Sequence, residues 1–322
     1  MTNTEAVFFR SQLLERRSRL EAVRLESEQA TRLLQEIDAA LERMEVGTYG
    51  LCAVCNDPIE KERLAVDPLA RVCLDHLTET EQRALEKDLE LALRIQATLL
   101  PGHNVRSGDW QSYYHYRPCG PVSGDFCDLL DCDGNGLFFI TGDISGKGVA
   151  ASLLMSHLHA IFRTLVPLGL PLSELMARAN TVFSRGTMPA HYATLACGFA
   201  QPSGVVEVCN AGHCPPVVLR HGEAVSLAAT GLPLGMFAGG QYTAHRIALD
   251  PGDTLVLYTD GVTEARDGAD AEYGFERLYA HLLACRALAP EALAKSCVSD
   301  VERFLSGAPQ QDDVTIMVLR RG

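Results

Sequence analysis

Two short ligand pairs place the strongest constraint on how this chain folds. Cys52 and Cys55 form one pair, and Cys73 and His76 form the other, with seventeen residues between the pairs. A tetrahedral zinc site needs four soft or borderline ligands, and each pair supplies two of them from one tight turn. A short segment with little apolar core can fold around such a metal. The spacing therefore favours a zinc site over the alternative of four unrelated buried residues.

The residues around these pairs resemble the zinc finger of the DksA/TraR family. The resemblance rests on three short motifs, namely Gly47-Thr48-Tyr49-Gly50, Asp57-Pro58-Ile59 and Arg63-Leu64. His76 stands where many members of that family carry a fourth cysteine, and zinc accepts this substitution. We expect a zinc finger over residues 47–77.

Apolar residues recur at heptad spacing in the segment before the finger. One position of the heptad holds Leu13, Leu20, Leu34 and Leu41, and the position three residues later holds Val23, Ala30, Ile37 and Met44. This spacing is typical of a coiled-coil seam, although Arg16 and Ser27 interrupt it. We expect one long helix over residues 1–46 that favours a homodimer. The alternative is an amphipathic helix that packs on its own chain.

A connector helix is expected over residues 78–101, directly after the finger. One face of this helix carries five apolar residues, Leu85, Leu89, Ala92, Ile95 and Leu99. Pro101 ends it, because proline cannot continue a helix.

Beyond Gly108 the sequence changes to short apolar or alternating runs separated by Gly, Pro and Asp, which is the pattern of β-strands. We expect strands over residues 113–117, 137–141, 193–200, 205–209, 217–220, 254–259 and 314–320. Helices are expected over residues 149–165, 172–184, 275–284 and 290–305. Strands and helices do not alternate as they do in a parallel α/β fold. The expected fold is therefore α+β, an antiparallel β-sandwich flanked by helices over residues 102–322.

Aspartates lie where several predicted strands meet glycine. They are Asp125, Asp143, Asp260 and the pair Asp312-Asp313. One such aspartate is usually a turn residue. Four sets beside apolar runs suggest carboxylates that converge on hard cations at one rim of a sheet. Mg²⁺ and Mn²⁺ take oxygen ligands, and a few aspartates with a backbone carbonyl can hold two ions about 3.5–4 Å apart.

With these motifs the chain resembles the metal-dependent protein phosphatases (PPM), in their bacterial SpoIIE/RsbU-like branch, over residues 90–320. Each motif is weak alone, but their order and spacing are specific. The motifs are Ile95-Gln96, Leu99-Leu100-Pro101, Arg117-Pro118, Ser123-Gly124-Asp125, Asp143-Ile144-Ser145-Gly146-Lys147-Gly148, Asn210-Ala211-Gly212-His213, Gly231-Leu232-Pro233-Leu234-Gly235, Asp260-Gly261-Val262-Thr263-Glu264-Ala265 and Asp312-Asp313-Val314-Thr315. The resemblance implies a PPM-type sandwich and a serine/threonine protein phosphatase that uses two Mn²⁺ or Mg²⁺ ions.

The resemblance also implies roles for single residues. Asp125 and Asp143 match the ligands that the two ions share, and the carbonyl of Ile144 contributes beside them. Asp260 and Asp312 match ligands of one ion. These four carboxylates would make the catalytic set, with water attacking phosphorus in line. Neither a phosphoenzyme nor a nucleophilic cysteine is needed.

Two further aspartates and two substitutions depart from this core set. Asp313, as a further metal-site residue, and Asp128 would orient waters or a third ion. Ser123 and Cys127 replace a glycine and a tyrosine common in the family without removing a carboxylate, so activity should survive. The histidine general acid of eukaryotic relatives is missing, as is usual in this branch.

Lys147 and His213 invite catalytic roles that the sequence does not favour. Lys147 lies among glycines, but its spacing is not that of a P-loop, so nucleotide binding is rejected. We expect a solvated lysine there. We expect His213 to have a structural role in its turn.

Composition excludes several classes of protein. Acidic residues outnumber basic ones by 41 to 28, a net charge of −13, which opposes direct nucleic-acid binding. Eleven cysteines without an export signal indicate reduced thiols. No run reaches the roughly 18 apolar residues of a membrane span, so no membrane partner is expected. We expect a cytoplasmic protein.

The leading hypothesis is a phosphatase that acts on a partner protein. In the branch that this chain resembles, the substrate is typically an anti-sigma-factor antagonist, which implies a partner-switching pathway, and the first 100 residues would regulate the enzyme through the zinc finger. One alternative is an RNA-polymerase-binding transcription regulator with a non-catalytic phosphatase-like domain. DksA-type proteins use a two-helix hairpin, whereas about 45 residues before the finger suffice for one long helix. A third possibility is a phosphatase of a small phosphorylated molecule.

Overall fold

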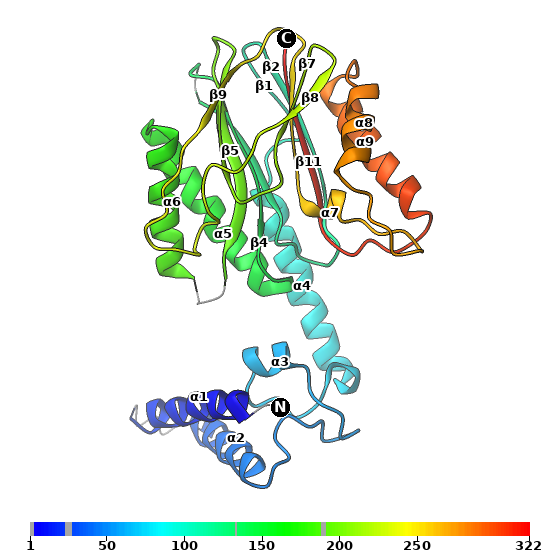
Figure 1. Ribbon diagram of the computed structural model, residues 1–322. Coiled ribbons are helices and arrows are strands. Elements are labelled where there is room, and N and C mark those ends of the chain that lie inside the picture. Colours follow the sequence, from blue (N-terminus) through cyan, green and yellow to red (C-terminus); the bar gives the residue numbers. More distant parts are fainter. Residues whose placement is uncertain (1–2, 23–27, 133, 188–190) are drawn as a thin grey trace. The chain divides into compact units, whose positions relative to one another are not determined.

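The computed structural model of the protein describes residues 3–22, 28–132, 134–187 and 191–322. The chain forms two compact units, Met1–Asp88 and Leu89–Gly322. Their boundary falls inside helix α4 (Glu79–Leu99), the helix that the sequence predicts as a connector (Figure 1). The two units are described separately below.

The N-terminal unit is a pair of helices packed on a small finger. Its elements are α1 (Asn3–Ala22), α2 (Glu28–Glu45), α3 (Lys61–Val66) and the short 3₁₀ helix η1 (Leu74–His76). Helices α1 and α2 contact each other. Their apolar residues join those of the finger in one core, which contains Phe9, Leu13, Ile37, Ala40, Tyr49, Cys52, Ile59, Leu64, Ala70 and Cys73.

The prediction of one long helix over residues 1–46 is wrong. The chain forms two helices, and the heptad residues Leu13 and Ile37 are fully buried within this unit. The two helices cover each other and the finger, so apolar residues of the seam are buried within one chain. The seam therefore supplies no argument for a homodimer. Val23 and Ser27 lie outside the described residues.

The C-terminal unit is a sandwich of two antiparallel sheets. The six-stranded sheet has the order β1-β2-β11-β10-β7-β8, and the five-stranded sheet has the order β3-β4-β5-β6-β9. The strands of the first sheet are β1 (Asn104–Ser107), β2 (Trp110–Arg117), β7 (Val217–Arg220), β8 (Glu223–Ser226), β10 (Thr254–Tyr258) and β11 (Val314–Arg321). Those of the second are β3 (Phe126–Asp131), β4 (Leu137–Ile144), β5 (Ala193–Ala200), β6 (Val205–Ala211) and β9 (His245–Ala248).

Helices cover the outer face of each sheet (Figure 1). Helices α5 (Gly148–Leu165) and α6 (Leu172–Gly186) pack on the five-stranded sheet, and the 3₁₀ helix η2 (Val166–Leu168) follows α5. Helices α8 (Phe275–Ala284) and α9 (Pro290–Leu305) pack on the six-stranded sheet. The one-turn helix α7 (Asp260–Thr263) follows β10. The predicted antiparallel sandwich with outer helices is confirmed.

Strand β4 shows why the sequence folds into layers. Phe138 and Ile140 point to the core under α5, whereas Leu137 and Phe139 point to the core between the two sheets. Both faces are apolar because side chains alternate along a strand and both sides of this strand are covered. The result is a four-layer arrangement with three adjoining cores.

Among the described residues, one stretch, Gly148–Leu168, is long and apolar enough to cross a membrane by length and composition. It contains α5, whose residues Met155, Leu158 and Phe162 are buried in the core against the five-stranded sheet. A core helix passes the same test, so this stretch is explained by packing.

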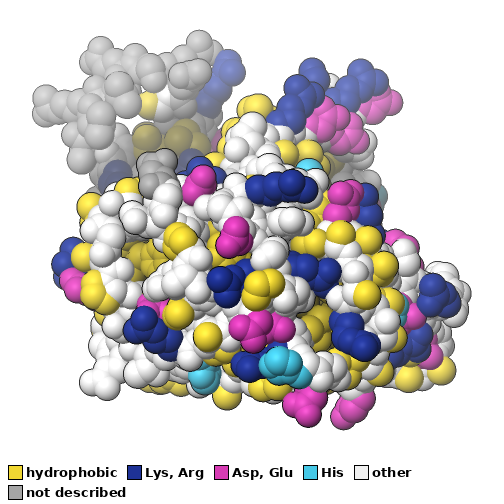
Figure 2. Space-filling model, turned by 90° about the horizontal axis from the view of Figure 1, so that it is seen from above, with side chains coloured by type: hydrophobic (Ala, Val, Ile, Leu, Met, Phe, Trp, Pro, Cys, Tyr) yellow, Lys and Arg dark blue, Asp and Glu magenta, His cyan; other side chains and the backbone are white. Residues whose placement is uncertain are grey.

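Charged side chains of both signs are interspersed on the face that Figure 2 shows. No field of one sign forms on that face.

Candidate metal centres

Four of the predicted site carboxylates lie at strand ends in the two sheets. Asp125 directly precedes β3, and Asp143 is the last residue but one of β4. Asp260 begins α7 just after β10, and Asp312 lies two residues before β11. Because β3 pairs with β4 and β10 pairs with β11, each sheet contributes two carboxylates.

Asp125 joins the two sheets. Its carboxylate is 1% exposed and accepts hydrogen bonds from two hydroxyls of the six-stranded sheet, Thr259 at 2.8 Å and Thr315 at 2.5 Å. Burial, followed by the negative charge of Asp143, raises the pKa of Asp125 well above its ordinary value. A buried carboxylate of this kind is held in the ionised form most easily by a cation.

The carboxylates of Asp125, Asp143, Asp260 and Asp312, together called the carboxylate rim, repel one another. Burial, followed by the charges of Asp260 and Asp312, raises the pKa of Asp143 to about 7. Burial and the charge of Asp312 also raise the pKa of Asp260. The four do not form a compact single-ion cluster among the described residues. A binuclear site needs a wider spread of ligands, and hard oxygen donors of this kind fit Mg²⁺ or Mn²⁺.

Two glycines allow the backbone to close around these carboxylates. A Cβ atom at Gly124 would lie 3.1 Å from the carbonyl oxygen of Ile144 and 3.2 Å from Oδ1 of Asp143. A Cβ atom at Gly261 would lie 1.9 Å from the carbonyl oxygen of Asp313. The first glycine brings the Asp125 loop against β4, and the second brings α7 against the loop before β11.

Asp313 is bound by protein donors. Its Oδ1 accepts from the Cys119 backbone N–H at 2.6 Å, and its Oδ2 accepts from the Ser123 hydroxyl at 2.6 Å and the Gly124 N–H at 3.1 Å. These bonds tie the loop that carries Asp125 to the loop that carries Asp312. Ser123, noted in the sequence only as a substitution, therefore has a bonding role.

Asp128 does not join the acidic rim, which corrects its expected role in orienting waters or a third ion. Its carboxylate is 2% exposed and pairs with Arg163 at 2.6 and 2.8 Å, and His159 Nε2 lies 3.3 Å away. Burial alone would raise the pKa of Asp128, but His159 and Arg163 lower it. The alternation of β3 turns Asp128 toward α5, so it anchors that helix.

Gln96 connects α4 with the Asp125 loop. This side chain is 7% exposed, donates to the Ser123 carbonyl at 2.8 Å and accepts from the Ser123 N–H at 3.2 Å. Ser123 lies two residues before Asp125, and its hydroxyl accepts from the Asp125 N–H at 3.1 Å. A shift of this part of α4 would move the loop that carries the most buried carboxylate.

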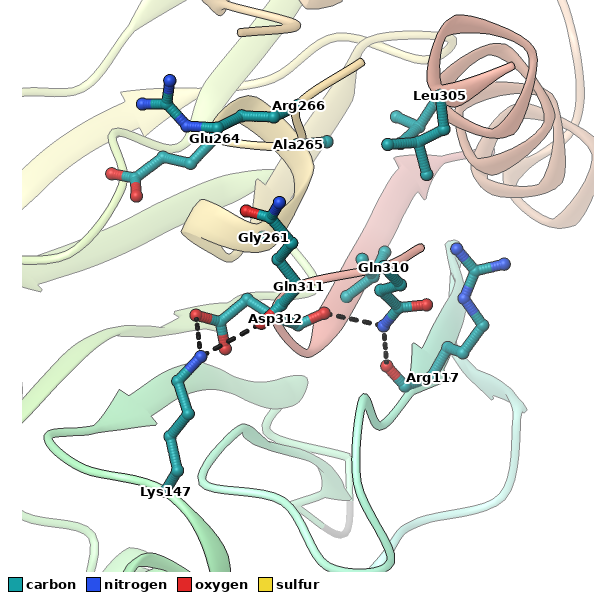
Figure 3. Close-up of a pocket in the computed structure, with 12 residues that line it drawn as sticks. Arg117, Lys147, Gly261, Glu264, Ala265, Arg266, Leu305, Gln310, Gln311 and Asp312 are labelled. Carbon is teal, nitrogen blue, oxygen red and sulfur yellow. Dashed lines mark hydrogen bonds and ion pairs between the residues drawn. The ribbon is translucent and has the colours of Figure 1, made fainter. Parts of the chain in front are cut away.

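Lys147 is exposed, as expected, but it is also paired. Its Nζ lies 3.0 Å from Asp312 Oδ2 and donates to the Gln311 carbonyl at 3.0 Å. Lys147, Gln311 and Asp312 line a cavity of about 220 Å³, together with Arg117 and Arg266 (Figure 3). The interaction was missed in the sequence because the two residues are 165 positions apart.

His213 has the structural role that the sequence predicts. It is 7% exposed, its backbone N–H donates to Asn210 Oδ1 at 2.8 Å, and its Nδ1 lies 2.9 Å from the Thr194 hydroxyl. Burial lowers the pKa of His213 to about 4, so the ring is neutral at physiological pH.

The second candidate centre is the finger. The ligand atoms of Cys52, Cys55, Cys73 and His76 all lie within 4.8 Å of one another. Cys73 Sγ lies 3.1 Å from His76 Nδ1, and Cys55 Sγ lies 3.9 Å from Cys73 Sγ. Three thiols and an imidazole at this spacing fit tetrahedral zinc.

Comparisons with protein families match both parts of the chain. The model described as Stage II sporulation protein E (SpoIIE) matches residues 133–322. The model described as prokaryotic dksA/traR C4-type zinc finger matches residues 47–75, so His76 lies one residue beyond that match.

Curated relatives are identical to this chain at between a quarter and a third of the aligned residues. Phosphoserine phosphatase RsbU of Bacillus subtilis is 26% identical over 246 residues, which cover 74% of this chain and 72% of the relative. Phosphoserine phosphatase RsbP of the same organism is 27% identical over 188 residues, 56% of this chain and 46% of the relative. Protein IcfG of Synechocystis is 28% identical over 270 residues, which cover 73% of this chain and 41% of the relative. The chain thus spans less than half the length of the last two.

Solved structures share the fold of this chain. The SiaA-PP2C domain of Pseudomonas aeruginosa has a TM-score of 0.67 at 19% identity and covers 76% of this chain and all of its own. The RsbU and RsbW domains of Rv1364c from Mycobacterium tuberculosis have a TM-score of 0.58 at 26% identity. The match covers 68% of this chain and 62% of that structure. The C-terminal unit therefore has a phosphatase-type fold.

Proposed function

Since the chain belongs to the Stage II sporulation protein E (SpoIIE) family, we propose that it is a metal-dependent serine/threonine protein phosphatase. The observation that carries the proposal is the convergence of Asp125, Asp143, Asp260 and Asp312 from two sheets. Burial and mutual repulsion raise the pKa values of the first three, which leaves a rim that a cation would stabilise.

Two Mn²⁺ or Mg²⁺ ions would be held by these four carboxylates and the carbonyl oxygen of Ile144, with Asp313 beside them. When bound, such ions neutralise phosphoryl oxygens and activate water near neutral pH. The hydroxyls of Thr259 and Thr315 orient Asp125. Asp313 holds the Asp125 loop through Ser123 and Gly124. The protein groups thus position the carboxylates that would hold the ions, which suits phosphoryl transfer.

The proposed substrate is a phosphorylated protein of the anti-sigma-factor-antagonist type in a partner-switching pathway. Two relatives are named phosphoserine phosphatases, and one similar structure contains an RsbU domain together with an RsbW domain. The resemblance of the sequence motifs to the SpoIIE/RsbU-like branch supports the same substrate class. We place this activity in the cytoplasm.

We further propose that the N-terminal unit regulates the enzyme through zinc. Cys52, Cys55, Cys73 and His76 would hold one Zn²⁺. Helix α4 begins three residues after His76 and carries Gln96, which binds the Asp125 loop. A change in the finger could therefore reach the carboxylate rim along one continuous helix.

The test of regulation is a comparison of zinc-loaded and zinc-depleted protein. Zinc removal should change turnover at least threefold in the wild type and should have little effect in Gln96→Met, which keeps the shape but loses both bonds to Ser123. Thr98→Val, in the exposed part of the same turn, is the matched control. Equal zinc dependence in all three would refute coupling through Gln96.

The alternative function is RNA-polymerase binding with a non-catalytic phosphatase-like domain. The segment before the finger forms two helices rather than the single helix expected, so the absence of a helix pair no longer counts against this alternative. Each has 20 residues or fewer, about 30 Å at most. The complete set of carboxylates still favours an enzyme.

The test of activity is Mn²⁺- and Mg²⁺-dependent hydrolysis of p-nitrophenyl phosphate and of a serine-phosphorylated antagonist protein. Turnover should fall at least a hundredfold in Asp143→Ala and Asp260→Ala, because each loses a ligand. Glu223→Ala, an exposed carboxylate on β8, should behave as wild type. Equal turnover in all variants would contradict the proposed site, and binding of RNA polymerase without turnover would support the alternative.

A further inference from the structure

A second cleft lies entirely within the N-terminal unit, between α2 and the loops of the finger. It encloses about 800 Å³, which is within the range of small-molecule sites. Leu33, Leu69 and Val72 contribute apolar wall. Five arginines from both sides line it, namely Arg16, Arg32, Arg43, Arg63 and Arg71. Such a concentration of positive charge is unexpected in a chain with a net charge of −13.

The carboxylates of the cleft do not neutralise these arginines fully. Three acidic residues line it, Glu36, Asp67 and Glu81. Asp67 Oδ1 accepts from the Leu69 N–H at 3.0 Å. Glu81 Oε2 accepts from the N–H and the hydroxyl of Thr78 at 2.9 and 2.7 Å. These carboxylates keep their charge, and the hydrogen bonds from Thr78, followed by the charge of Arg63, lower the pKa of Glu81. Five guanidinium groups against three carboxylates still leave positive charge in excess in the lining.

Two of the arginines are held in place by protein contacts. Arg43 is half-buried, lies 5.8 Å from the Tyr49 ring centroid and donates its Nε to the Ala39 carbonyl at 3.4 Å. Arg63 donates its Nε to the Val72 carbonyl at 3.1 Å. In both, the terminal guanidinium nitrogens have no ion-pair partner within the described part of the chain. These nitrogens are pre-organised donors.

Arg71 places a second positive charge close to Arg43. Burial, followed by the charge of Arg71, lowers the pKa of Arg43. Arg71 is exposed, and its backbone carbonyl accepts from the Ala53 N–H at 2.8 Å, so the finger fixes its Cα position. Two like charges held together by the fold are stabilised by an anion, and most strongly by a dianion.

We propose that this cleft binds the phosphate group of a small phosphorylated molecule, with Arg43 and Arg71 as the principal donors. A guanidinium presents a planar fork that matches phosphate oxygens, and two of them match a dianion. The apolar wall would contact the rest of the ligand. The concave shape favours a small molecule over a flat protein partner, and this inference does not depend on the proposed phosphatase activity.

The test is isothermal titration of the zinc-containing full chain with inorganic pyrophosphate, without added Mn²⁺ or Mg²⁺. Under these conditions the acidic rim repels anions, so the cleft dominates binding. We expect saturable binding that weakens about tenfold or more in Arg43→Gln and Arg71→Gln, because each loses charge-assisted hydrogen bonds. Arg83→Gln, an exposed arginine of α4 that pairs with Glu79 outside the cleft, should bind as wild type.

Three outcomes would overturn the proposal. They are absence of saturable binding to the wild type, equal weakening in Arg83→Gln, and binding of a hexaglutamate peptide with the same arginine dependence while pyrophosphate does not bind. The last would identify an acidic protein segment as the ligand. Zinc content and circular dichroism check the fold of each variant. Because Arg71 is exposed, Arg71→Gln decides the question if Arg43→Gln loses zinc.

Discussion

Asp125 illustrates how single residues make the carboxylate rim. It is buried, feels the negative charge of Asp143 and would be costly to ionise, but two threonine hydroxyls from the opposite sheet donate hydrogen bonds to one of its oxygens. These hydroxyls also fix the rotamer of the side chain. The residues that position Asp125, a proposed metal ligand, are therefore as important to the site as the carboxylate itself.

Thr315→Val tests this arrangement, since valine keeps the shape and removes the hydroxyl. Turnover at limiting Mn²⁺ should fall about tenfold, because the loss of a group that orients a metal ligand typically costs 10–100-fold. Saturating Mn²⁺ should recover part of the loss. Thr254→Val, in β10 away from the rim, is the control, and equal losses in both variants would show that the effect is on folding.

Asp143 gives the metal-free protein a pH-dependent stability. Its pKa is about 7 in the fold and 3.8 in the unfolded chain, so between these values the folded state binds a proton that the unfolded state lacks. Its contribution to stability is fully present below pH 3.8 and is lost as the pH rises through about 7.

Asp143→Asn should therefore unfold at a higher temperature than the metal-free wild type at pH 8. A gain on the order of 1 kcal/mol corresponds to about 2–4 °C in a domain of this size. The difference should shrink as the pH falls to 6. Asp88→Asn, on α4, serves as the control, and a gain that is independent of pH would contradict the assignment.

Helix α7 packs closely on the loop before β11. Gly261 lets the first turn of α7 lie against the backbone of Asp312 and Asp313, since any side chain there would overlap the Asp313 carbonyl. This contact brings Asp260 toward Asp312. Helix α7 has one turn only, so it is held by its packing and not by helix propensity.

Gly261→Ala should separate α7 from that loop. We expect a destabilisation of about 1–3 kcal/mol and at least a tenfold loss of Mn²⁺-dependent turnover, because overpacking forces the backbone to move. Thermal unfolding and p-nitrophenyl phosphate hydrolysis measure the two effects. Gly268→Ala is the matched control, since a Cβ atom there meets nothing within 4 Å.

The α1–α2 pair forms the support of the finger. Ile37 is fully buried against residues of α1 and the finger, whereas Leu14 is 39% exposed. Ile37→Ala should cost about 2–5 kcal/mol and accelerate zinc loss to a chelator, because the ligands would lose their packing. Leu14→Ala should retain zinc as wild type does. If a coiled-coil dimer buried the seam instead, Ile37→Ala would weaken dimerisation without changing zinc retention.

At the scale of the whole molecule, the chain divides into a finger unit and a sandwich unit. Each has its own core, and each carries its own candidate metal centre. A binding equilibrium stabilises the unit that contains the site. The two centres should therefore act on separate unfolding transitions.

Calorimetry of the full chain should resolve two transitions. Removal of zinc with a chelator should lower or abolish the transition of residues 1–88, since small zinc domains depend on their metal. Saturating Mn²⁺ should raise the other transition by several degrees in the wild type but not in Asp143→Ala. A single transition that responds to both metals would mean that the two units unfold together.

The strands show what patterns can and cannot predict. The seven predicted strands are all interior strands, whereas the four strands that the sequence pattern does not predict, β1, β3, β8 and β9, are the edges of the two sheets. Edge strands are covered less and carry polar residues, so their alternation is weak. In β8, for example, three of four residues are exposed. Strand β3 is largely buried, but its two aspartates interrupt the run of apolar residues by which a buried strand is predicted.

By itself, the sequence of this protein determined the antiparallel sandwich. Its spacing also predicted the group of Cys52, Cys55, Cys73 and His76 in the finger and the carboxylates at strand ends. These features follow from local spacing, because burial repeats along strands and ligand pairs share one turn. Only the tertiary structure decided that α1 and α2 form a pair and that Asp128 binds Arg163. It also decided that Thr315 binds Asp125, that Gln96 binds the Asp125 loop and that Lys147 pairs with Asp312. The side-chain contacts join residues 27 to 190 positions apart, and the helix pair depends on α1 packing against α2. No local sequence pattern predicts which distant elements pack together.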